Sequence, residues 1–240
     1  MNTALLLSAG LGTRLAPFTN NHPKALAIVN GKTLLQRNIE YLQEYEITNV
    51  VVNVHHFSKQ IIDDLKKNKG YGSNIIISDE TNEILETGGG LVFAKKHLEA
   101  QPHFLMMNVD VLTTLNIDEM YAHHLDYNPL ATLAVTHRSS TRELLFTEQL
   151  QLIGWRNRRT KEEKLPKGIP AHYQAFAFSG VHILSNQIFN NVELSGKFSI
   201  IDLYLDLCVS KKIICYNHSG DTFCDVGTPE SLEKAATLFK

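Results

Sequence analysis

Runs of apolar residues alternate with amphipathic segments through the first half of the chain. Short, almost entirely apolar runs predict buried strands at residues 4–7, 50–54, 74–78, 103–108 and 131–136. Between them, apolar residues recur at helical spacing, which predicts helices at residues 34–45, 58–68 and 91–98. Strands without polar alternation, separated by amphipathic helices, favour an α/β fold with a mostly parallel sheet and helices on both faces.

The pattern changes after residue 136. The sequence predicts a hairpin at 143–155, a charged loop at 156–167, a helix at 199–208, and strands at 175–184 and 213–216. A last helix is expected to begin at Pro229 with Thr228 as its cap. Because no repeat or low-complexity linker interrupts the chain, we expect a single domain over residues 1–240, with halves at 1–136 and 137–240.

Composition and charge exclude some classes of partner. Hydrophobic residues make up 43% and charged residues 20% of the 240 positions, as in an ordinary globular protein. The net charge of −2 offers no electrostatic basis for binding nucleic acid. Three cysteines without metal-ligand spacing are typical of reduced thiols, and no apolar run approaches the roughly 20 residues that span a bilayer. We therefore expect a cytoplasmic protein with neither a nucleic-acid nor a membrane partner.

The first apolar run ends in a stretch of small residues. Ser8, Ala9 and Gly10 have little or no side chain, so a phosphate could approach their main-chain N–H groups closely. Arg14 follows with a fork of donors that suits phosphate oxygens, and Lys24 adds a point-like positive charge. This arrangement predicts a bound nucleotide or sugar phosphate. A tight strand-to-helix turn without a ligand is the structural alternative.

Two better-known phosphate motifs are absent from this region. The dinucleotide fingerprint would need a glycine where Leu15 stands, and a P-loop ending at Gly31-Lys32-Thr33 would need one at Leu26. A dinucleotide-dependent oxidoreductase is therefore disfavoured.

A longer series of motifs resembles the sugar-1-phosphate nucleotidyltransferases. Its blocks stand in the family order over nearly the whole chain: Gly10-Leu11-Gly12-Thr13-Arg14-Leu15, Pro17, Thr19, Pro23-Lys24, Gly31-Lys32, Leu85-Glu86-Thr87-Gly88-Gly89-Gly90, Asn108-Val109-Asp110, Phe178-Ser179-Gly180 and Asp225-Val226-Gly227-Thr228. Within the family, the chain looks most like the N-acetylmuramate-1-phosphate uridylyltransferases and the mannose- or heptose-1-phosphate guanylyltransferases. The resemblance implies a Rossmann-like fold of the nucleotide-diphospho-sugar transferase type, with a small inserted sugar-binding lobe. The first half would then bind the nucleotide and the second half the sugar phosphate.

The resemblance also implies roles for individual residues. Arg14, Lys24 and Asp110 would be catalytic, with Arg14 on the triphosphate tail and Lys24 beside the transferred group. The nucleotide would contact Ala9, Gly10, Leu11, Gly12, Thr13, Arg14, Lys24, Thr87 and Gly88. Asn108 and Gly180 would contact the sugar phosphate, and Asp110 and Asp225 would hold Mg²⁺.

Asp110 and Asp225 each follow a strand-like stretch and precede a turn. Magnesium prefers oxygen ligands and is typically bound by one or two carboxylates together with substrate phosphates. The alternative is that both are ordinary cap or turn residues. Val109 departs from the family, which often has glycine there, and could change how closely a sugar approaches this backbone.

Four further features are open to a structural interpretation. Residues 87–90 could be a turn that precedes the helix expected at Leu91. Glu80 and Glu86 are weaker site candidates, and we expect them to be surface acids. The histidine pairs at 55–56 and 123–124 lack ligand spacing and are expected to be structural or exposed. The loop at 156–167 is expected to be a solvated surface, with a mobile flap near the sugar phosphate as the alternative.

The predicted activity is magnesium-dependent transfer of a nucleotidyl group from a nucleoside triphosphate to a sugar 1-phosphate, with release of pyrophosphate. UTP with an amino-sugar 1-phosphate is the first choice, and GTP with mannose or heptose 1-phosphate is the next. A non-catalytic nucleotide-sugar sensor on the same fold is the alternative. The sequence leaves the oligomeric state open.

Overall fold

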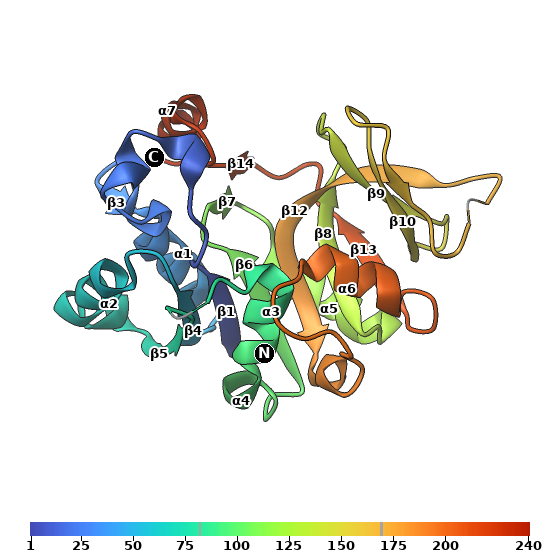
Figure 1. Ribbon diagram of the computed structural model, residues 1–240, viewed down its shortest axis with the longest axis horizontal. Helices are drawn as coiled ribbons and strands as arrows, with labels where there is room; N and C mark the ends of the chain where they lie inside the picture. The colour runs from blue at the N-terminus through green and yellow to red at the C-terminus, as the bar shows by residue number, and fades with distance from the viewer. Residues whose placement is uncertain (82, 169) are drawn as a thin grey trace.

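The computed structural model describes residues 1–81, 83–168 and 170–240 and shows a mixed α/β fold (Figure 1). Its strands are β1 Thr3–Leu7, β2 Ile28–Val29, β3 Lys32–Thr33, β4 Asn49–Val54, β5 Asn74–Asp79, β6 His103–Asn108, β7 Val111–Thr113, β8 Ala131–Thr136, β9 Arg142–Phe146, β10 Leu152–Asn157, β11 Glu163–Lys164, β12 Gln174–Ser185, β13 Ile213–Asn217 and β14 Phe223–Asp225. Its α-helices are α1 Leu34–Gln43, α2 Ser58–Lys67, α3 Glu86–Phe93, α4 Lys95–Leu98, α5 Ile117–Tyr127, α6 Ile200–Leu207 and α7 Pro229–Leu238. Short 3₁₀ helices are η1 Thr13–Leu15, η2 Phe18–Asn20, η3 Lys24–Leu26, η4 Lys69–Gly72 and η5 Asn186–Asn190.

Within the described residues, one large sheet runs through the molecule in the order β11-β10-β9-β12-β6-β1-β4-β5. The strands β6, β1, β4 and β5 are parallel, as the apolar runs of the first half predict. The long strand β12 joins antiparallel to β6, β8 and β9, and β13 adds to β8. The predicted hairpin is confirmed by the antiparallel pair of β9 and β10.

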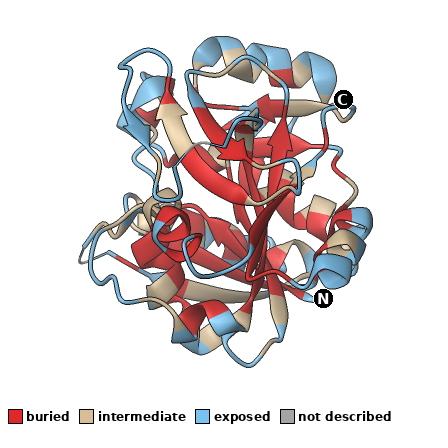
Figure 2. Ribbon diagram, turned by 90° about the vertical axis from the view of Figure 1, so that its right-hand side faces the viewer, coloured by how far each residue is buried: buried red, intermediate tan, exposed pale blue. Residues whose placement is uncertain are grey.

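Helices cover both faces of this sheet, which confirms the predicted fold class. Along β1, Leu5 and Leu7 point into a core with α3, α4 and α6, while Ala4 and Leu6 point into a second core with α1, α2 and α5. The alternation follows from the two-residue period of a strand. Buried residues accordingly fill the central strands and the inner sides of the helices (Figure 2).

A smaller third core joins the two ends of the chain. Leu15, Val29 and Leu34 from the beginning pack with Cys224 and Val226 from the end. In the same region β14 pairs antiparallel with β7, outside the large sheet. This short ribbon places the segment before α7 next to the segment that follows β6 (Figure 1).

Helix α3 differs from the prediction. It begins at Glu86, before the predicted start at Leu91, so residues 87–90 lie inside the helix and not in the turn that was the alternative interpretation of this segment. Glycine is needed because the backbone of α3 lies directly against another segment. A Cβ on Gly88 would be 2.4 Å from the Phe198 ring, and one on Gly89 would be 2.3 Å from Gly196 O.

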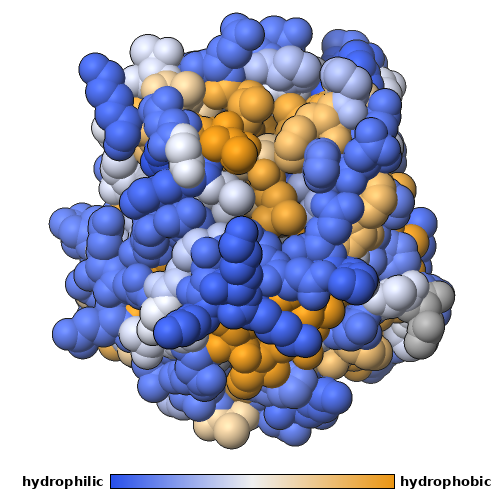
Figure 3. All heavy atoms as spheres, turned by 90° about the vertical axis from the view of Figure 1, so that its left-hand side faces the viewer, coloured by the Kyte–Doolittle hydropathy of each residue, from blue (hydrophilic) through white to orange (hydrophobic). Residues whose placement is uncertain are grey.

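The surface is largely polar on the face that Figure 3 presents, with apolar side chains gathered in separate areas. Exposed large apolar residues include Ile28 in β2 and Leu238 in α7. None of the helices in the described part of the chain combines the length and the apolar character that crossing a bilayer requires. The three cysteines are buried free thiols.

Candidate active site

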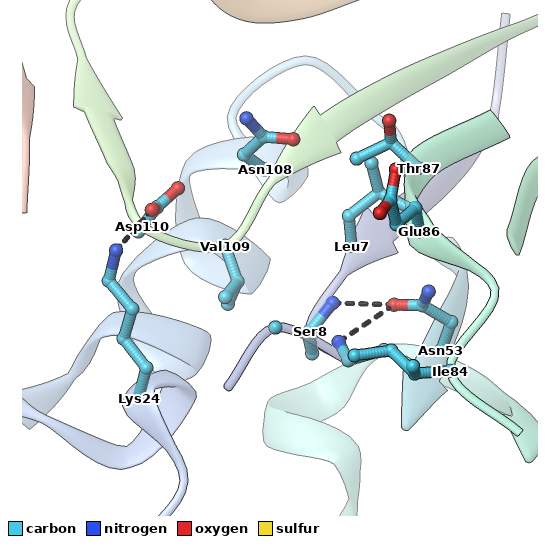
Figure 4. A pocket seen from close by; sticks show the side chains of 12 residues that line it. Leu7, Ser8, Lys24, Asn53, Ile84, Glu86, Thr87, Asn108, Val109 and Asp110 are labelled. Atoms are coloured by element: carbon cyan, nitrogen blue, oxygen red, sulfur yellow. Dashed lines mark hydrogen bonds and ion pairs between the residues drawn. The ribbon is translucent and has the colours of Figure 1, made fainter. Parts of the chain in front are cut away.

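The loop after β1 is held by a buried side chain of the neighbouring strand. Asn53 of β4 is 2% exposed, and its Oδ1 accepts hydrogen bonds from Ser8 N at 2.5 Å and Ala9 N at 3.3 Å (Figure 4). The parallel pairing of β1 with β4 brings these groups together, since it sets Leu7 opposite Asn53. The N–H groups of Ser8 and Ala9 are therefore occupied by protein. Gly10 is more open, because a Cβ added there would meet no atom within 4 Å.

Asn53 is held in turn by Glu80, at the end of β5. Asn53 Nδ2 donates to Glu80 Oε1 at 3.0 Å, and Glu80 is only 3% exposed, so the expectation of a surface acid is wrong for this residue. Burial raises the pKa of Glu80, and its Oε2 has no hydrogen-bond partner among the described residues. Gly90 of α3 leaves room for both side chains, since a Cβ there would lie 2.9 Å from Glu80 Oε1.

The glycine at position 12 allows the loop to lie against Lys24. Gly12 has a φ of 64°, and a Cβ on it would be 2.9 Å from Lys24 Cβ. Lys24 is 8% exposed, so it is a buried cation and not a solvated loop residue. Its ammonium group forms an ion pair with the Asp110 carboxylate (Figure 4).

Asp225 reaches the same place through the β7–β14 ribbon. In that ribbon Asp225 stands opposite Val111, the residue after Asp110, and Val226 N donates to Asp110 O at 2.8 Å. Partial desolvation and, next in size, the Asp110 carboxylate raise the pKa of Asp225. The ribbon pairing thus brings the two carboxylates close enough to repel each other.

Arg14 approaches these acids from the loop side. A Cβ on Gly227 would lie 3.0 Å from both Arg14 Nη2 and Asp225 Oδ1, so the glycine makes room for the two charged groups together. Arg14 and Lys24 both lower the pKa of Asp225 and so oppose its repulsion by Asp110. The structure thus gathers two carboxylates and two cations at one point.

Asn108 and Gly180, the predicted sugar-phosphate residues, are in contact. Asn108 ends β6, and Gly180 lies on β12 with a φ of 74°. A Cβ on Gly180 would be 2.7 Å from Asn108 Nδ2. The antiparallel pairing of β6 and β12 brings them together, and only glycine leaves the space that the amide fills.

A pocket of about 320 Å³ lies at the carboxyl ends of β1 and β6. Its lining includes six predicted site residues: Ala9, Gly10, Lys24, Thr87, Asn108 and Asp110. Thr87 Oγ1 also accepts from Ile200 N at 2.9 Å. Glu86, an exposed acid, lies on the same wall (Figure 4).

The remaining predicted residues lie outside this lining: Leu11, Gly12, Thr13, Arg14, Gly88, Gly180 and Asp225. Gly88 is buried and donates its N–H to Phe198 O at 3.0 Å. Its contact with a nucleotide, like the roles of the other site residues, stays a prediction.

Sequence reasoning missed two residues of this region. Asn53 gave a signal, because it is the polar member of the otherwise apolar run at residues 50–54, and a buried amide needs partners. Arg138, just after β8, gave none. Its charge acts on Asp225 although the two residues belong to distant segments of the chain, which only the fold reveals.

The acids of this site fit a magnesium ion. Within the described residues no group of three or more His, Cys, Asp or Glu side chains is placed to hold a metal, so a closed, all-protein cage is not formed there. A pair of carboxylates next to cations matches the open coordination of Mg²⁺, which keeps waters and takes substrate phosphates as ligands. A divalent ion between Asp110 and Asp225 would relieve the repulsion that raises the pKa of Asp225.

Comparison with known proteins adds independent findings. The sequence model of a family described as nucleotidyl transferases matches residues 3–240. The chain is 39% identical over 123 residues to the N-acetylmuramate alpha-1-phosphate uridylyltransferase of Caulobacter vibrioides, which covers 50% of this chain and 47% of that protein. It is 27% identical over 237 residues to mannose-1-phosphate guanyltransferase 2 of Candida glabrata, which covers 98% of this chain and 64% of that protein. The chain thus spans about half the length of the curated relatives it first matches.

Solved structures share the whole fold. HddC from Yersinia pseudotuberculosis superposes with a TM-score of 0.80 at 26% identity and covers 100% of both chains. The same protein complexed with GMP-PN gives a TM-score of 0.78 at 25% identity, again over 100% of both chains.

Proposed function

The chain belongs to the nucleotidyl transferase family, and on this basis we propose that it is a sugar-1-phosphate nucleotidyltransferase. In the proposed reaction an oxygen of the sugar 1-phosphate attacks the α-phosphorus of a nucleoside triphosphate. The bond from that phosphorus to the leaving pyrophosphate breaks, and a nucleotide-activated sugar forms. The observation that carries the proposal is the β7–β14 pairing, which joins Asp225 to Asp110 beside Lys24 and Arg14.

The main obstacle to this reaction is the approach of two anions. Transfer of this type depends on positioning and on charge stabilisation, with little covalent work by the protein. Lys24 would neutralise charge at the transferred group, and Arg14 would hold the triphosphate tail. Asp110 and Asp225 would hold the ion, and magnesium, when bound, supplies a positive charge between the phosphates. Because Asn53 occupies the N–H groups of Ser8 and Ala9, phosphate oxygens would meet the loop from Gly10 onward.

The choice of substrates is supported by the relatives in two directions. The first choice is UTP with an amino-sugar 1-phosphate, because the uridylyltransferase of Caulobacter vibrioides has the highest identity of the relatives compared above. The second is GTP with mannose or heptose 1-phosphate. A guanyltransferase aligned over 98% of this chain and the HddC structure complexed with GMP-PN support it.

A pyrophosphate-release screen tests the proposal. Four nucleoside triphosphates are each combined with several sugar 1-phosphates, with Mg²⁺ or with EDTA. We expect turnover for one combination, its loss in EDTA, and its loss in Asp110→Asn and Asp225→Asn, each with an unchanged circular dichroism spectrum. Asp126→Asn, an exposed acid on α5, is the matched control and should keep its activity. Nucleotide binding without any turnover would favour the sensor, and near-normal turnover in both site variants would refute the metal assignment.

A further inference from the structure

Arg138 is a half-buried cation whose hydrogen bonds go only to neutral groups. Its Nη2 donates to Phe178 O at 2.6 Å, and its Nη1 donates to Thr136 Oγ1 at 2.9 Å and to Ala177 O at 3.3 Å. The guanidinium carbon lies 4.4 Å from the centre of the Phe223 ring. Among the described residues no carboxylate forms an ion pair with Arg138.

Such a cation is costly to keep without a counter-ion. Removing a charge from water is unfavourable unless an opposite charge or several hydrogen bonds compensate it. Desolvation lowers the pKa of Arg138, yet a guanidinium stays protonated in proteins. The carbonyl groups and the aromatic ring fix the direction of the side chain, and its positive charge remains available to an anion.

The position of Arg138 indicates which anion. Two of its acceptors, Ala177 O and Phe178 O, lie on β12 shortly before Gly180, which contacts Asn108. Phe223, under the guanidinium, lies on β14 two residues before Asp225. The charges of Arg138 and Asp225 interact, since each shifts the pKa of the other. Arg138 therefore contacts both the strand that carries Gly180 and the strand that carries Asp225.

We propose that Arg138 binds the phosphate of the sugar 1-phosphate acceptor. The inference rests on the proposed function and extends it to a residue of the second half of the chain. Arg14 and Lys24 come from the loop segment that would carry the triphosphate, so the second anion needs a cation of its own. The Nε–H of Arg138 makes no hydrogen bond with the described residues, and a guanidinium can bind a phosphate through two parallel N–H groups.

A buried chain of polar groups supports this orientation. Ser179 Oγ lies 3.5 Å from Arg138 Nη1 and 2.8 Å from His218 Nε2, and His218 Nδ1 lies 3.4 Å from Asp221 Oδ2. With the imidazole proton on Nδ1 toward Asp221, Nε2 accepts from the Ser179 hydroxyl. The Ser179 oxygen then keeps its lone pairs for Arg138. Burial lowers the pKa of His218, so the ring is neutral at pH 7 and adds no competing charge.

Steady-state kinetics on the substrate pair that the wild type accepts test the proposal. Arg138→Met should raise the KM for the sugar 1-phosphate about 10- to 100-fold, as the loss of a charge-assisted contact implies, and leave the KM for the nucleoside triphosphate within about twofold. Arg138→Lys should give a KM for the sugar 1-phosphate between those of the wild type and Arg138→Met. Lys67→Met removes an exposed cation at the end of α2 and should change neither constant.

One further variant and the wild type distinguish failure of the Arg138 proposal from failure of the proposed function. Ser179→Ala removes one of the three contacts of Nη1 and keeps the charge, so it should raise only the KM for the acceptor, by less than Arg138→Met does. If Arg138→Met fails to fold, the lysine and serine variants carry the test. An unchanged acceptor KM, or an equal rise in both constants, would overturn the role of Arg138 while the wild-type turnover upholds the enzyme. Absence of turnover in the wild type would instead reject the proposed function and the acceptor site with it.

Discussion

Replacement of Asn53 by leucine tests whether the loop after β1 is organised by one buried amide. Leucine has a similar volume, so the change removes hydrogen bonds without opening a cavity. It deletes the acceptor of Ser8 N and Ala9 N and the donor to Glu80 Oε1. We expect both the stability of the fold and the binding of the nucleotide to decrease.

The magnitude follows from the burial of each group. An N–H or oxygen left without a partner in the interior costs about 1–3 kcal/mol. Ser8 is 4% exposed and Glu80 3% exposed, so both contribute, whereas the half-buried Ala9 N can find water. We therefore expect a loss of about 2–4 kcal/mol in the free energy of unfolding, which leaves a typical domain folded.

Urea denaturation at pH 7 measures this loss, and the KM for the nucleoside triphosphate should rise in parallel because the loop is no longer fixed. Asn49→Leu, at the other end of β4, is the matched control. Its Oδ1 only accepts a bond from exposed Asn74, and we expect a change within about 0.5 kcal/mol. A loss below about 1 kcal/mol for Asn53→Leu, together with an unchanged nucleotide KM, would refute the reasoning.

Three other predictions concern stability. Gly90→Ala brings a Cβ within 2.9 Å of Glu80 Oε1 and should lower Tm by about 2–8 °C. The control Gly220→Ala adds a Cβ that meets no atom within 4 Å and should leave Tm unchanged. Equal Tm values for the two variants would contradict the packing argument. Burial lowers the pKa of His182 to about 3. Between pH 6.5 and 3 the unfolded chain therefore binds a proton at this residue that the native protein does not bind. As the pH is lowered from 6.5 to 3, this group should reduce the free energy of unfolding by about 1.4 kcal/mol per pH unit. His182→Asn should therefore make the free energy of unfolding, measured by urea titration, depend less on pH. Burial raises the pKa of Glu80, so its stabilising contribution is complete below pH 4.5 and is lost as the pH rises through the pKa of the native state. The stability of Glu80→Gln relative to the wild type should therefore increase from pH 4.5 to 7. A difference in the free energy of unfolding that stays constant over this range would contradict the assignment.

Local patterns predicted much of the fold. The apolar runs of the first half became the parallel strands β1, β4, β5 and β6, and the last helix begins at Pro229 with Thr228 as its cap. In each case the determining feature is a property of a few consecutive residues. An apolar strand can be buried on both faces, and a threonine hydroxyl can accept the free N–H groups of the first turn.

Local patterns failed where a distant segment decides the outcome. A turn was the alternative interpretation of the glycines at 88–90, but they lie in α3. Glycine is required there because Phe198 and Gly196 occupy the space beside the helix. From the sequence, Glu80 is predicted to be a surface acid, because carboxylates are rarely buried without a partner. Its partner, Asn53, lies on the adjacent strand β4, and only the sheet brings the two together.

The sequence by itself determined which chemical groups this protein carries and the short elements that hold them, including the glycine-rich loop with Arg14 and Lys24. Only the tertiary structure decided which of these groups share a site. Asp225 meets Asp110 through the β7–β14 ribbon, and Arg138 reaches the same acids from β8. Side-chain chemistry and local conformation belong to short stretches of chain, whereas contacts between remote segments depend on how the whole chain closes its loops and packs its cores.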